Sequence, residues 1–298
     1  MGFIMSFATR FAGEHKIKTA DLRLGIIAGN RKFPQIFARE ARRDGVRCLV
    51  TVAFEGETDP AIEPLVDCVE WLKLGQLQKL IEAFQKHAIR QVVMVGQIAP
   101  KNLFKNLRLD WRMAKLLAQL KRKNAETIFG AIGAELARNG IELVPHARFL
   151  RRIIPGSGVL TKRKPDKEER EDFQFGWNIA RQIAALDIGQ TVVVKRGMVL
   201  AVEAFEGTDV ALRRGGELGQ GGAEGVGNKG AGAVAVKATK PGQDMRFDIP
   251  CIGCDTIKTL KKAGISALGI EADKTLLLEK ESLLEMANEA KIAIEALE

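Results

Sequence analysis

The feature that most constrains the fold is the alternation of short, β-rich apolar runs with amphipathic helical stretches. Three such runs, LRLGIIAG, CLVTVAF and QVVMVGQI, occupy residues 22–29, 48–54 and 91–98. The stretches between them repeat apolar residues at helical spacing, and the first ends at Gly45. Strands that alternate with helices build a parallel sheet through crossover connections. The first half of the chain therefore predicts an α/β fold with a Rossmann-like domain over residues 22–147.

The second half predicts a mixed α/β domain over residues 168–298, and 298 residues are enough for two domains. A helix is expected at 168–186, followed by a hairpin at the tight Lys195-Arg196-Gly197 turn. Further strands near 233–238, 266–270 and 275–279 and a C-terminal helix from about residue 280 complete this expectation. Residues 148–167 carry two prolines, two glycines and seven basic residues, and are expected to be the inter-domain linker. Residues 1–21 are expected to be a flexible leader.

Residues 215–232 form a glycine-rich stretch, with nine glycines in eighteen positions. Such a sequence buries too little apolar surface to offset its backbone entropy, so we expect it to be mobile. It is interpreted either as a surface insertion or as a catalytic lid, because candidate site residues lie on both sides of it.

Composition excludes several classes of protein. No apolar run approaches the roughly 18–20 residues that span a bilayer, and the N-terminal residues lack the pattern of a secretory signal, so we expect a cytoplasmic protein. The four cysteines are expected to be reduced thiols. Cys251 and Cys254 form a C-x-x-C pair, but a zinc ribbon would need a second pair, and redox or metal chemistry there is the less favoured interpretation.

The net charge of +9 is unevenly distributed. Eight basic residues and one acidic residue lie between Lys101 and Lys123, and six basic residues without an acid lie between Arg148 and Lys164. These stretches are either solvated faces or surfaces for phosphates and anionic headgroups. The chain has no tyrosine, and its aromatic residues are not interleaved with the basic ones, so we expect no nucleic-acid partner.

The first candidate binding segment is Gly25 to Pro34, GIIAGNRKFP, which follows a strand and precedes a helix. Glycines at such a turn let the backbone approach a phosphate near the helix N-terminus. The segment lacks the third glycine of the dinucleotide-binding fingerprint, and no acidic residue closes the second strand cleanly. A structural turn and a ligand loop both remain open.

The second candidate segment is Glu203 to Arg214, EAFEGTDVALRR, directly after the hairpin. It offers three carboxylates, a hydroxyl group and two arginines within twelve residues. Glu206 or Asp209 could hold a metal, and backbone N–H groups at the helix start could bind an oxyanion. Alternatively, Thr208 or Asp209 acts only as the helix cap.

The third candidate segment is Lys237 to Pro250, KATKPGQDMRFDIP. Its cations are Lys237, Lys240 and Arg246, its carboxylates are those of Asp244 and Asp248, and Gln243 adds an amide. Pyrophosphate hydrolysis needs this mixture: cations offset the charge on non-bridging oxygens, and a carboxylate holds Mg²⁺ or orients water. From composition alone, a charged turn between strands is the simpler alternative.

Three motifs together resemble the UDP-2,3-diacylglucosamine pyrophosphatase family of the LpxI type. They are AGNRKFP near the start, LDIGQTVVVKRGMVLAVEAFEGTD at 186–209 and KPGQDMRFDIPCIG at 240–253. The resemblance extends from about Leu22 to the end of the chain, with the motifs in the same order. It implies a Rossmann-like N-terminal domain and a C-terminal domain of unusual α/β topology, with the substrate between them. It also implies Mg²⁺-dependent hydrolysis of UDP-2,3-diacylglucosamine to UMP and 2,3-diacylglucosamine 1-phosphate (lipid X), a step of lipid A synthesis.

The resemblance assigns site residues by motif. The essential aspartate of the family falls on Asp248, and the glutamine before it falls on Gln243. The E-G-T-D motif falls on Glu206, Gly207, Thr208 and Asp209. From these motifs and from the charges and turns of the three candidate segments, the expected catalytic residues are Asp248, Asp209, Gln243 and Lys240; the expected substrate-binding residues are Gly29, Asn30, Gly207, Thr208, Lys237 and Arg246; and the expected Mg²⁺ ligands are Asp248, Asp209 and Glu206. The chain departs from the family at Arg31, which stands where the N-terminal loop usually has a second glycine.

A diacylated substrate requires access to a membrane surface, so the basic stretches are hypothesised to touch the inner leaflet at roughly 1 kcal/mol per well-placed Lys or Arg. Homo-oligomerisation is a further hypothesis. Two functions of other classes stay open from the residues themselves. One is an NAD(P)-dependent oxidoreductase that uses the N-terminal loop, and the other is a non-catalytic module that binds a nucleotide sugar or lipid.

Overall fold

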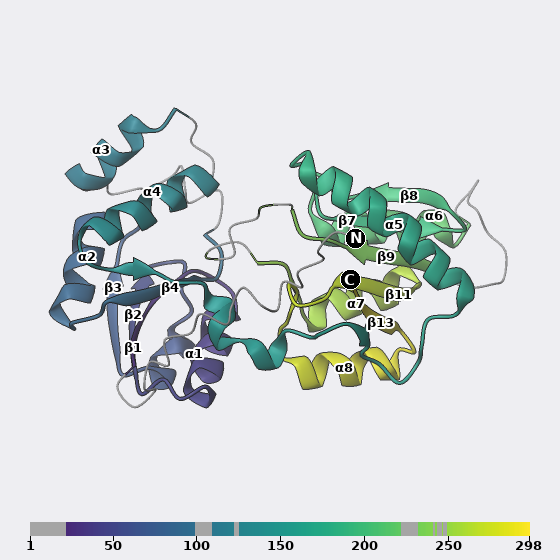
Figure 1. Cartoon of the computed structure of the whole chain (residues 1–298), viewed down its shortest axis with the longest axis horizontal. Coiled ribbons are helices and arrows are strands. Elements are labelled where there is room, and N and C mark those ends of the chain that lie inside the picture. The colour runs from purple at the N-terminus through teal and green to yellow at the C-terminus, as the bar shows by residue number, and fades with distance from the viewer. Residues whose placement is uncertain are drawn as a thin grey trace, which may run out of the picture. The chain divides into compact units, whose positions relative to one another are not determined.

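The structure, a computed structural model of the chain, describes residues 22–98, 109–121, 125–221, 232–240, 242, 246 and 249–298. These residues form two compact units that divide between Val144 and Pro145. Each unit has its own sheet (Figure 1). The expected leader at 1–21 lies outside the described residues.

Unit 1 is built on a five-stranded parallel sheet in the order β3-β2-β1-β4-β5. Its elements are β1 (Arg23–Ala28), α1 (Phe33–Arg43), β2 (Cys48–Phe54), η3 (Pro60–Leu65), β3 (Cys68–Leu72), α2 (Leu77–Lys86), β4 (Gln91–Val95), α3 (Trp111–Gln119), α4 (Ala125–Arg138) and β5 (Glu142–Leu143). Five of the six residues of β1 are buried, as expected for a central strand covered on both faces. The predicted parallel α/β sheet is confirmed.

Unit 2 contains a six-stranded mixed sheet in the order β6-β13-β11-β9-β7-β8 and a two-stranded parallel pair, β10-β12. Its elements are η4 (His146–Phe149), η5 (Arg151–Ile153), β6 (Gly158–Val159), α5 (Lys167–Ala185), β7 (Thr191–Lys195), β8 (Met198–Val202), α6 (Thr208–Gly219), β9 (Ala233–Lys237), β10 (Cys251–Ile252), α7 (Cys254–Ala263), β11 (Ile265–Glu271), β12 (Leu276–Leu277), α8 (Lys280–Glu289) and β13 (Ala293–Leu297). The mixed α/β class expected for this half is confirmed.

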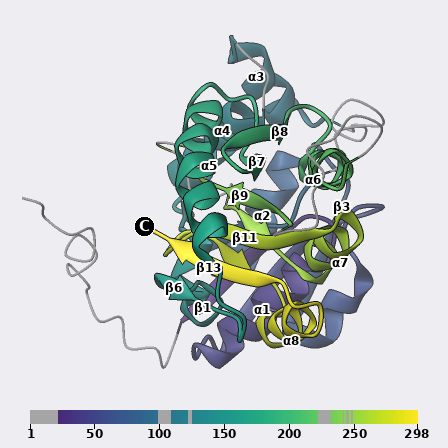
Figure 2. The same ribbon diagram turned by 90° about the vertical axis from the view of Figure 1, so that its right-hand side faces the viewer.

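Helices cover both faces of the large sheet in unit 2. Helix α5 lies on one face, and α6, α7 and α8 lie on the other (Figure 2). Alternate residues of β7 serve the two cores: Val192 and Val194 pack toward α5, whereas Val193 packs toward α6 and α7. This is the period-two alternation of a strand that is buried on both sides.

The segment 148–167, expected to be a linker, contains regular structure that belongs to unit 2. Strand β6 pairs antiparallel with β13, and Leu160 N donates to Ile294 O at 2.8 Å. Arg163 donates from both terminal nitrogens to the buried carboxylate of Glu169, at 2.9 Å each. One of the basic residues of this stretch is thus used to fix the start of α5.

The glycine-rich stretch begins inside a helix. Gly215 and Gly216 belong to α6, so the prediction of a mobile segment from residue 215 is wrong for the end of this helix. A Cβ at Gly215 would lie 2.5 Å from the Cβ of Val193, and one at Gly216 would lie 2.1 Å from the carbonyl oxygen of Ala263. These glycines therefore let α6 approach β7 and α7 closely. Residues 222–231 lie outside the described residues.

Gly216→Ala should destabilise the protein by about 1–3 kcal/mol, because the added methyl group must displace the backbone of α7. Denaturant unfolding measures this loss. Gly130→Ala is the matched control: it also lies within a helix, α4, but its Cβ would meet nothing within 4 Å. That substitution should stabilise by about 0.5–1 kcal/mol. Equal stability of the Gly216→Ala variant and the unchanged chain would contradict the close packing.

Candidate active site

Polar side chains lie together at one edge of the large sheet in unit 2, namely the edge formed by the ends of its strands. Strands β8 and β9 end at this edge, and β7, which is antiparallel to both, begins there. The register places Thr191 of β7 opposite Lys237 of β9, and Glu203 N donates to Thr191 O at 2.8 Å. On the neighbouring strand, the carboxylate of Glu271 accepts from Thr239 N at 2.7 Å. The edge therefore collects carboxylates, hydroxyl groups and a cation.

Lys237, Thr208 and Glu203 form a continuous hydrogen-bonded chain at this edge. The Lys237 ammonium donates to the Thr208 hydroxyl at 3.0 Å, and that hydroxyl donates to Glu203 Oε1 at 2.8 Å. The other carboxylate oxygen of Glu203 accepts from Gln190 N at 3.3 Å. Lys237 is only 9% exposed, so its charge is held in a largely buried position.

The Lys237 ammonium lies at the N-terminus of α6, where the helix already presents a partial positive charge. Gly207 is the N-cap, with φ +82°, a conformation that favours glycine, and Thr208 is the first helical residue. The N–H groups of a helix's first turn have no partner within the helix. A cation beside them is unfavourable by itself, so the arrangement is suited to an anion.

A second buried lysine shows the ordinary arrangement at the opposite end of the same helix. Lys195 of β7 donates from its ammonium to Gly219 O at 2.7 Å, at the C-terminus of α6. A cation stabilises that end of a helix because the dipole is negative there. The two lysines lie on adjacent strands, and only Lys237 opposes the dipole.

The electrostatics of Glu203 follow from its neighbours. Burial by itself raises the pKa of this carboxyl, but the charge of Lys237 and the hydrogen bonds from Thr208 and from Gln190 N outweigh it and hold the pKa below its usual value. Glu203 is therefore ionised at neutral pH. It offsets part of the Lys237 charge and fixes the Thr208 hydroxyl.

Glu203→Gln should make the free energy of unfolding less dependent on pH in the acidic range. An unfolded glutamate has a pKa of about 4.3, and the folded value of Glu203 is lower, so its contribution is fully present above the unfolded value. That contribution is lost as the pH falls through the folded pKa. Urea unfolding at a series of pH values measures the slope. The Lys237→Met variant should reduce the same pH dependence, and an unchanged slope in Glu203→Gln would contradict the assignment.

Comparison with known proteins places both halves of the chain in one family. The profile of the LpxI N-terminal domain matches residues 23–153, and that of the LpxI C-terminal domain matches residues 156–295. The chain belongs to the LpxI family. Among curated proteins, it is 30% identical over 272 residues to "UDP-2,3-diacylglucosamine pyrophosphatase LpxI" of Caulobacter vibrioides, which covers 90% of this chain and 94% of that protein.

Among solved structures, the chain is similar to glycinamide-RNase-transformylase T from Mycobacterium tuberculosis. The identity is 11%, the TM-score is 0.23, and the match covers 62% of this chain and 44% of that chain. A likeness this weak carries no argument about the site. In the part of the chain that the structure describes, no helix is long and apolar enough to cross a membrane.

The E-G-T-D motif of the LpxI family forms the start of α6. Gly207 and Thr208 lie as described above, and neither Thr208 nor Asp209 caps the helix, so that sequence-based alternative is wrong. Asp209 is exposed in the first turn, with its carboxylate 3.4 Å from the Thr259 hydroxyl. The Glu206 carboxylate accepts from Arg214 at 3.0 Å, and the same arginine also donates to Val202 O.

The second motif of the family lies partly beyond the described residues, which exclude Asp248 and Gln243. Lys240 is described, and its ammonium forms an ion pair with Asp187 at 3.0 Å. Arg246 is described as a turn residue whose backbone carbonyl accepts from His146 Nδ1 at 3.3 Å. Burial lowers the pKa of His146 to about 4, so this histidine is neutral with its proton on Nδ1.

Two predicted binding residues, Gly29 and Asn30, belong to unit 1. Asn30 Nδ2 donates to Glu57 Oε2 at 2.8 Å, and Asn30 N donates to Gln97 O at 2.6 Å. A Cβ at Gly29 would lie 2.4 Å from the carbonyl oxygen of Gln97, so close packing by itself requires glycine at this position. Arg31 has φ +63°, so the position where the family usually has glycine keeps the conformation that favours glycine.

Sequence reasoning counted Glu203 among the carboxylates of the second candidate segment but gave it no role, and it overlooked Glu271 and His146. Glu203 and Glu271 end or directly follow strands whose carboxyl ends meet at one edge, and that position is the signal that could have found them. The importance of His146 depends on its contact with a residue 100 positions away, so no local pattern shows it.

The donors near α6 fit the chemistry of Mg²⁺. Asp209 offers an exposed carboxylate, and Glu206 offers a second one that Arg214 partly occupies. Mg²⁺ takes oxygen ligands and usually needs only one or two carboxylates, with water and substrate phosphates for the rest. The expected set of Asp248, Asp209 and Glu206 stays a prediction, because Asp248 lies outside the described residues.

Proposed function

We propose that the chain hydrolyses the pyrophosphate bond of UDP-2,3-diacylglucosamine to give UMP and 2,3-diacylglucosamine 1-phosphate. The family membership supports the reaction, and one observation carries its location. That observation is the buried Lys237 ammonium at the N-terminus of α6, which Thr208 and Glu203 hold in place. A doubly charged pyrophosphate group needs this concentration of positive charge.

In this proposal, the residues at the edge bind and orient the pyrophosphate. Lys237 and the first N–H groups of α6 offset charge on the non-bridging oxygens, and this charge grows in the transition state. An ammonium has three N–H groups, and the contact with Thr208 uses one of them. Glu203 keeps the Thr208 hydroxyl and the ammonium fixed, so little reorganisation is needed when the substrate arrives.

Water attacks one phosphorus, the P–O–P bridge breaks, and the proton of the water is lost to solvent or to a carboxylate. We assign Asp248 to the orientation of this water or to the Mg²⁺ ion, with Asp209 and Glu206 as further ligands, and Gln243, Lys240 and Arg246 as contacts to the phosphates. Bound Mg²⁺ would polarise the phosphoryl oxygens. Gly29 and Asn30 are assigned to the uridine nucleotide or the sugar.

The test is release of UMP from UDP-2,3-diacylglucosamine by the full chain. We expect one UMP per lipid product, loss of the reaction in EDTA, and its return when Mg²⁺ is added in excess. Binding of the substrate without release of UMP would favour a non-catalytic module instead. Binding of NAD(P) with hydride transfer would favour the oxidoreductase.

Contact with an anionic membrane is a separate part of the proposal and depends on the diacyl chains of the substrate. It rests on the basic stretches 101–123 and 148–164, in which Lys121, Lys162 and Lys164 are exposed. Arg163 is left out of the test because it is paired with Glu169. Joint replacement of the three lysines by glutamine should weaken binding to vesicles that contain anionic lipid and should leave binding to neutral vesicles unchanged. Equal binding of the variant and the unchanged chain would remove this part alone.

A further inference from the structure

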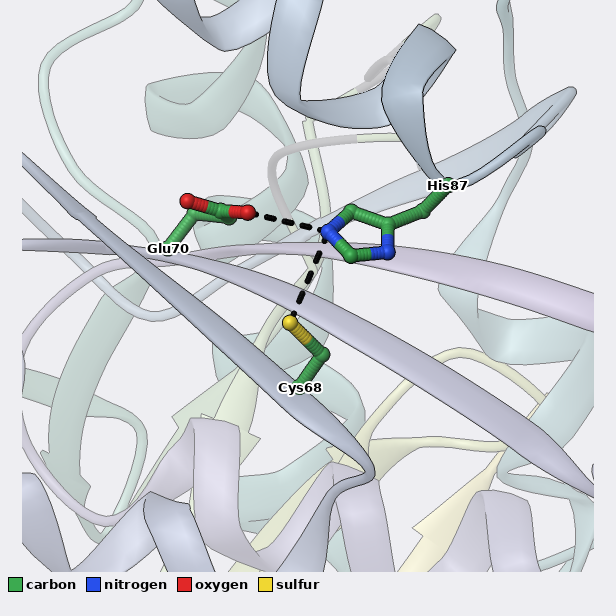
Figure 3. Close-up of side chains that lie close together, drawn as sticks. All are labelled: Cys68, Glu70 and His87. Atoms are coloured by element: carbon green, nitrogen blue, oxygen red, sulfur yellow. Dashed lines mark hydrogen bonds and ion pairs between the residues drawn. The ribbon is translucent and has the colours of Figure 1, made fainter.

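Three side chains that the proposed hydrolysis does not use meet in unit 1. Cys68 and Glu70 are alternate residues of the edge strand β3, and His87 follows the last turn of α2 (Figure 3). His87 Nε2 lies 3.5 Å from Cys68 Sγ and 2.9 Å from Glu70 Oε1. The three potential ligand atoms all lie within 4.8 Å of one another. In the part of the chain that the structure describes, this is the one such group of three.

We propose that Cys68, Glu70 and His87 bind a zinc ion, with water as the fourth ligand. The proposal is independent of the hydrolase function, and it concerns a different ion from Mg²⁺. A thiolate and an imidazole suit zinc and cobalt, whereas Mg²⁺ prefers oxygen ligands in octahedral geometry.

The distances are close to those that tetrahedral zinc requires. Zn–S and Zn–N bonds of about 2.3 and 2.0–2.1 Å place the sulfur about 3.5 Å from the nitrogen, which agrees with the separation of Cys68 Sγ and His87 Nε2. The same geometry places nitrogen and carboxylate oxygen about 3.3 Å apart. Glu70 Oε1 at 2.9 Å would therefore withdraw by a few tenths of an ångström.

The surroundings hold the ligands in place and leave access to the site. The side chains of His87 and Glu70 are 22% and 27% exposed, so both are partly buried but within reach of an ion from solvent. Arg23 donates to His87 O at 2.9 Å, which fixes the backbone of this ligand against β1. Zinc would thus tie the edge strand of the sheet to the end of α2. The zinc site is also separate from the predicted binding residues of unit 1: Cys68 lies at the start of β3, whereas Gly29 and Asn30 follow the opposite, carboxyl end of β1.

The Lys86 ammonium competes with a metal ion for the carboxylate of Glu70. It donates to Glu70 Oε1 at 2.8 Å, the same oxygen that faces His87. A cation at this position repels a divalent ion and occupies one lone pair of its ligand. Lys86→Gln removes both effects and leaves the three ligands intact, so this variant should bind zinc more tightly than the unchanged chain.

Zinc binding replaces the S–H bond of Cys68 by an S–Zn bond and releases one proton, without oxidation or reduction. Zinc binds the thiolate form of cysteine, so the metal displaces the thiol proton. The apparent affinity should therefore increase as the pH is raised.

Cobalt titration of the chelator-stripped full chain tests the proposal. We expect one equivalent to bind with thiolate-to-cobalt charge-transfer absorption, and zinc should displace it. Cys68→Ala should abolish this absorption and weaken binding at least about 100-fold, whereas Cys251→Ser, an exposed control, should retain it. Absorption that persists in Cys68→Ala, or the absence of cobalt binding by the unchanged chain, would overturn the proposal.

Folding of the variants does not limit the test, because Lys86→Gln alters no ligand. Tighter cobalt binding by Lys86→Gln supports the site even if Cys68→Ala does not fold. Unchanged or weaker binding by a folded Lys86→Gln variant would count against it. Zinc should also raise the midpoint of thermal unfolding of the unchanged chain, because it binds the folded state.

Discussion

Lys237→Met should lower kcat for UMP release by about 10²–10³-fold while the protein stays folded. The methionine keeps most of the side-chain volume but removes a preorganised cation from the N-terminus of α6, and the loss of one such donor has this cost. Stability at neutral pH should fall, because Glu203 loses the cation that stabilises its ionised form, although that cation also opposes the helix dipole. Steady-state kinetics together with denaturant unfolding measure the two effects separately.

Lys195→Met provides the matched control for this prediction. Lys195 is also buried on a central strand and also donates to α6, but to Gly219 at the C-terminus. Its replacement removes a favourable interaction with the dipole, so we expect lower stability and nearly unchanged kcat at a temperature where the variant is folded. If the two variants lose activity equally, Lys237 has no special role in the chemistry.

Asp248→Asn should lower kcat by at least about 10³-fold, which corresponds to about 4 kcal/mol in the activation barrier. The amide keeps the shape of the side chain but removes the charge that would hold Mg²⁺ or orient water. The dependence on Mg²⁺ should distinguish these roles. A metal ligand shifts the Mg²⁺ concentration needed for half-maximal rate, and a water-orienting group leaves it unchanged.

Asp273→Asn is the control for the charge change. Asp273 has φ +57°, a conformation that asparagine tolerates as well as aspartate does, so this variant should fold and turn over normally. Near-full activity of Asp248→Asn would remove Asp248 from the site and transfer the metal role to Asp209.

The class of the fold could be predicted because its main signals are local. The runs at 22–29, 48–54 and 91–98 are central strands that bury both faces, and burial of both faces gives a strong apolar pattern. The sequence did not predict the edge strand β3 or the C-terminal strand β13. All five residues of CVEWL are half-buried, and AIEAL has a composition that also suits a helix.

The glycines of α6 show where local composition misleads. A sequence rich in glycine predicts disorder, but Gly215 and Gly216 are required by atoms of β7 and α7 that lie far away in the sequence. The candidate site was also only partly predictable, because part of it depends on contacts between residues that are far apart in the sequence. A family motif located Thr208, and the charges of the third candidate segment located Lys237. The contact of Lys237 with Glu203 through Thr208, however, depends on strand register, which the sequence does not display.

The close approach of α6 to β7 has a consequence for how this enzyme tolerates change. Because Gly215 and Gly216 set the separation of helix and sheet, they also set where the opposite end of the helix meets Lys237. Natural variants with larger residues at these two positions would displace the end of α6 that we propose to bind phosphate, without altering any polar side chain. Catalytic divergence within the family could therefore arise from apolar substitutions in the core, which a survey of charged residues alone would overlook.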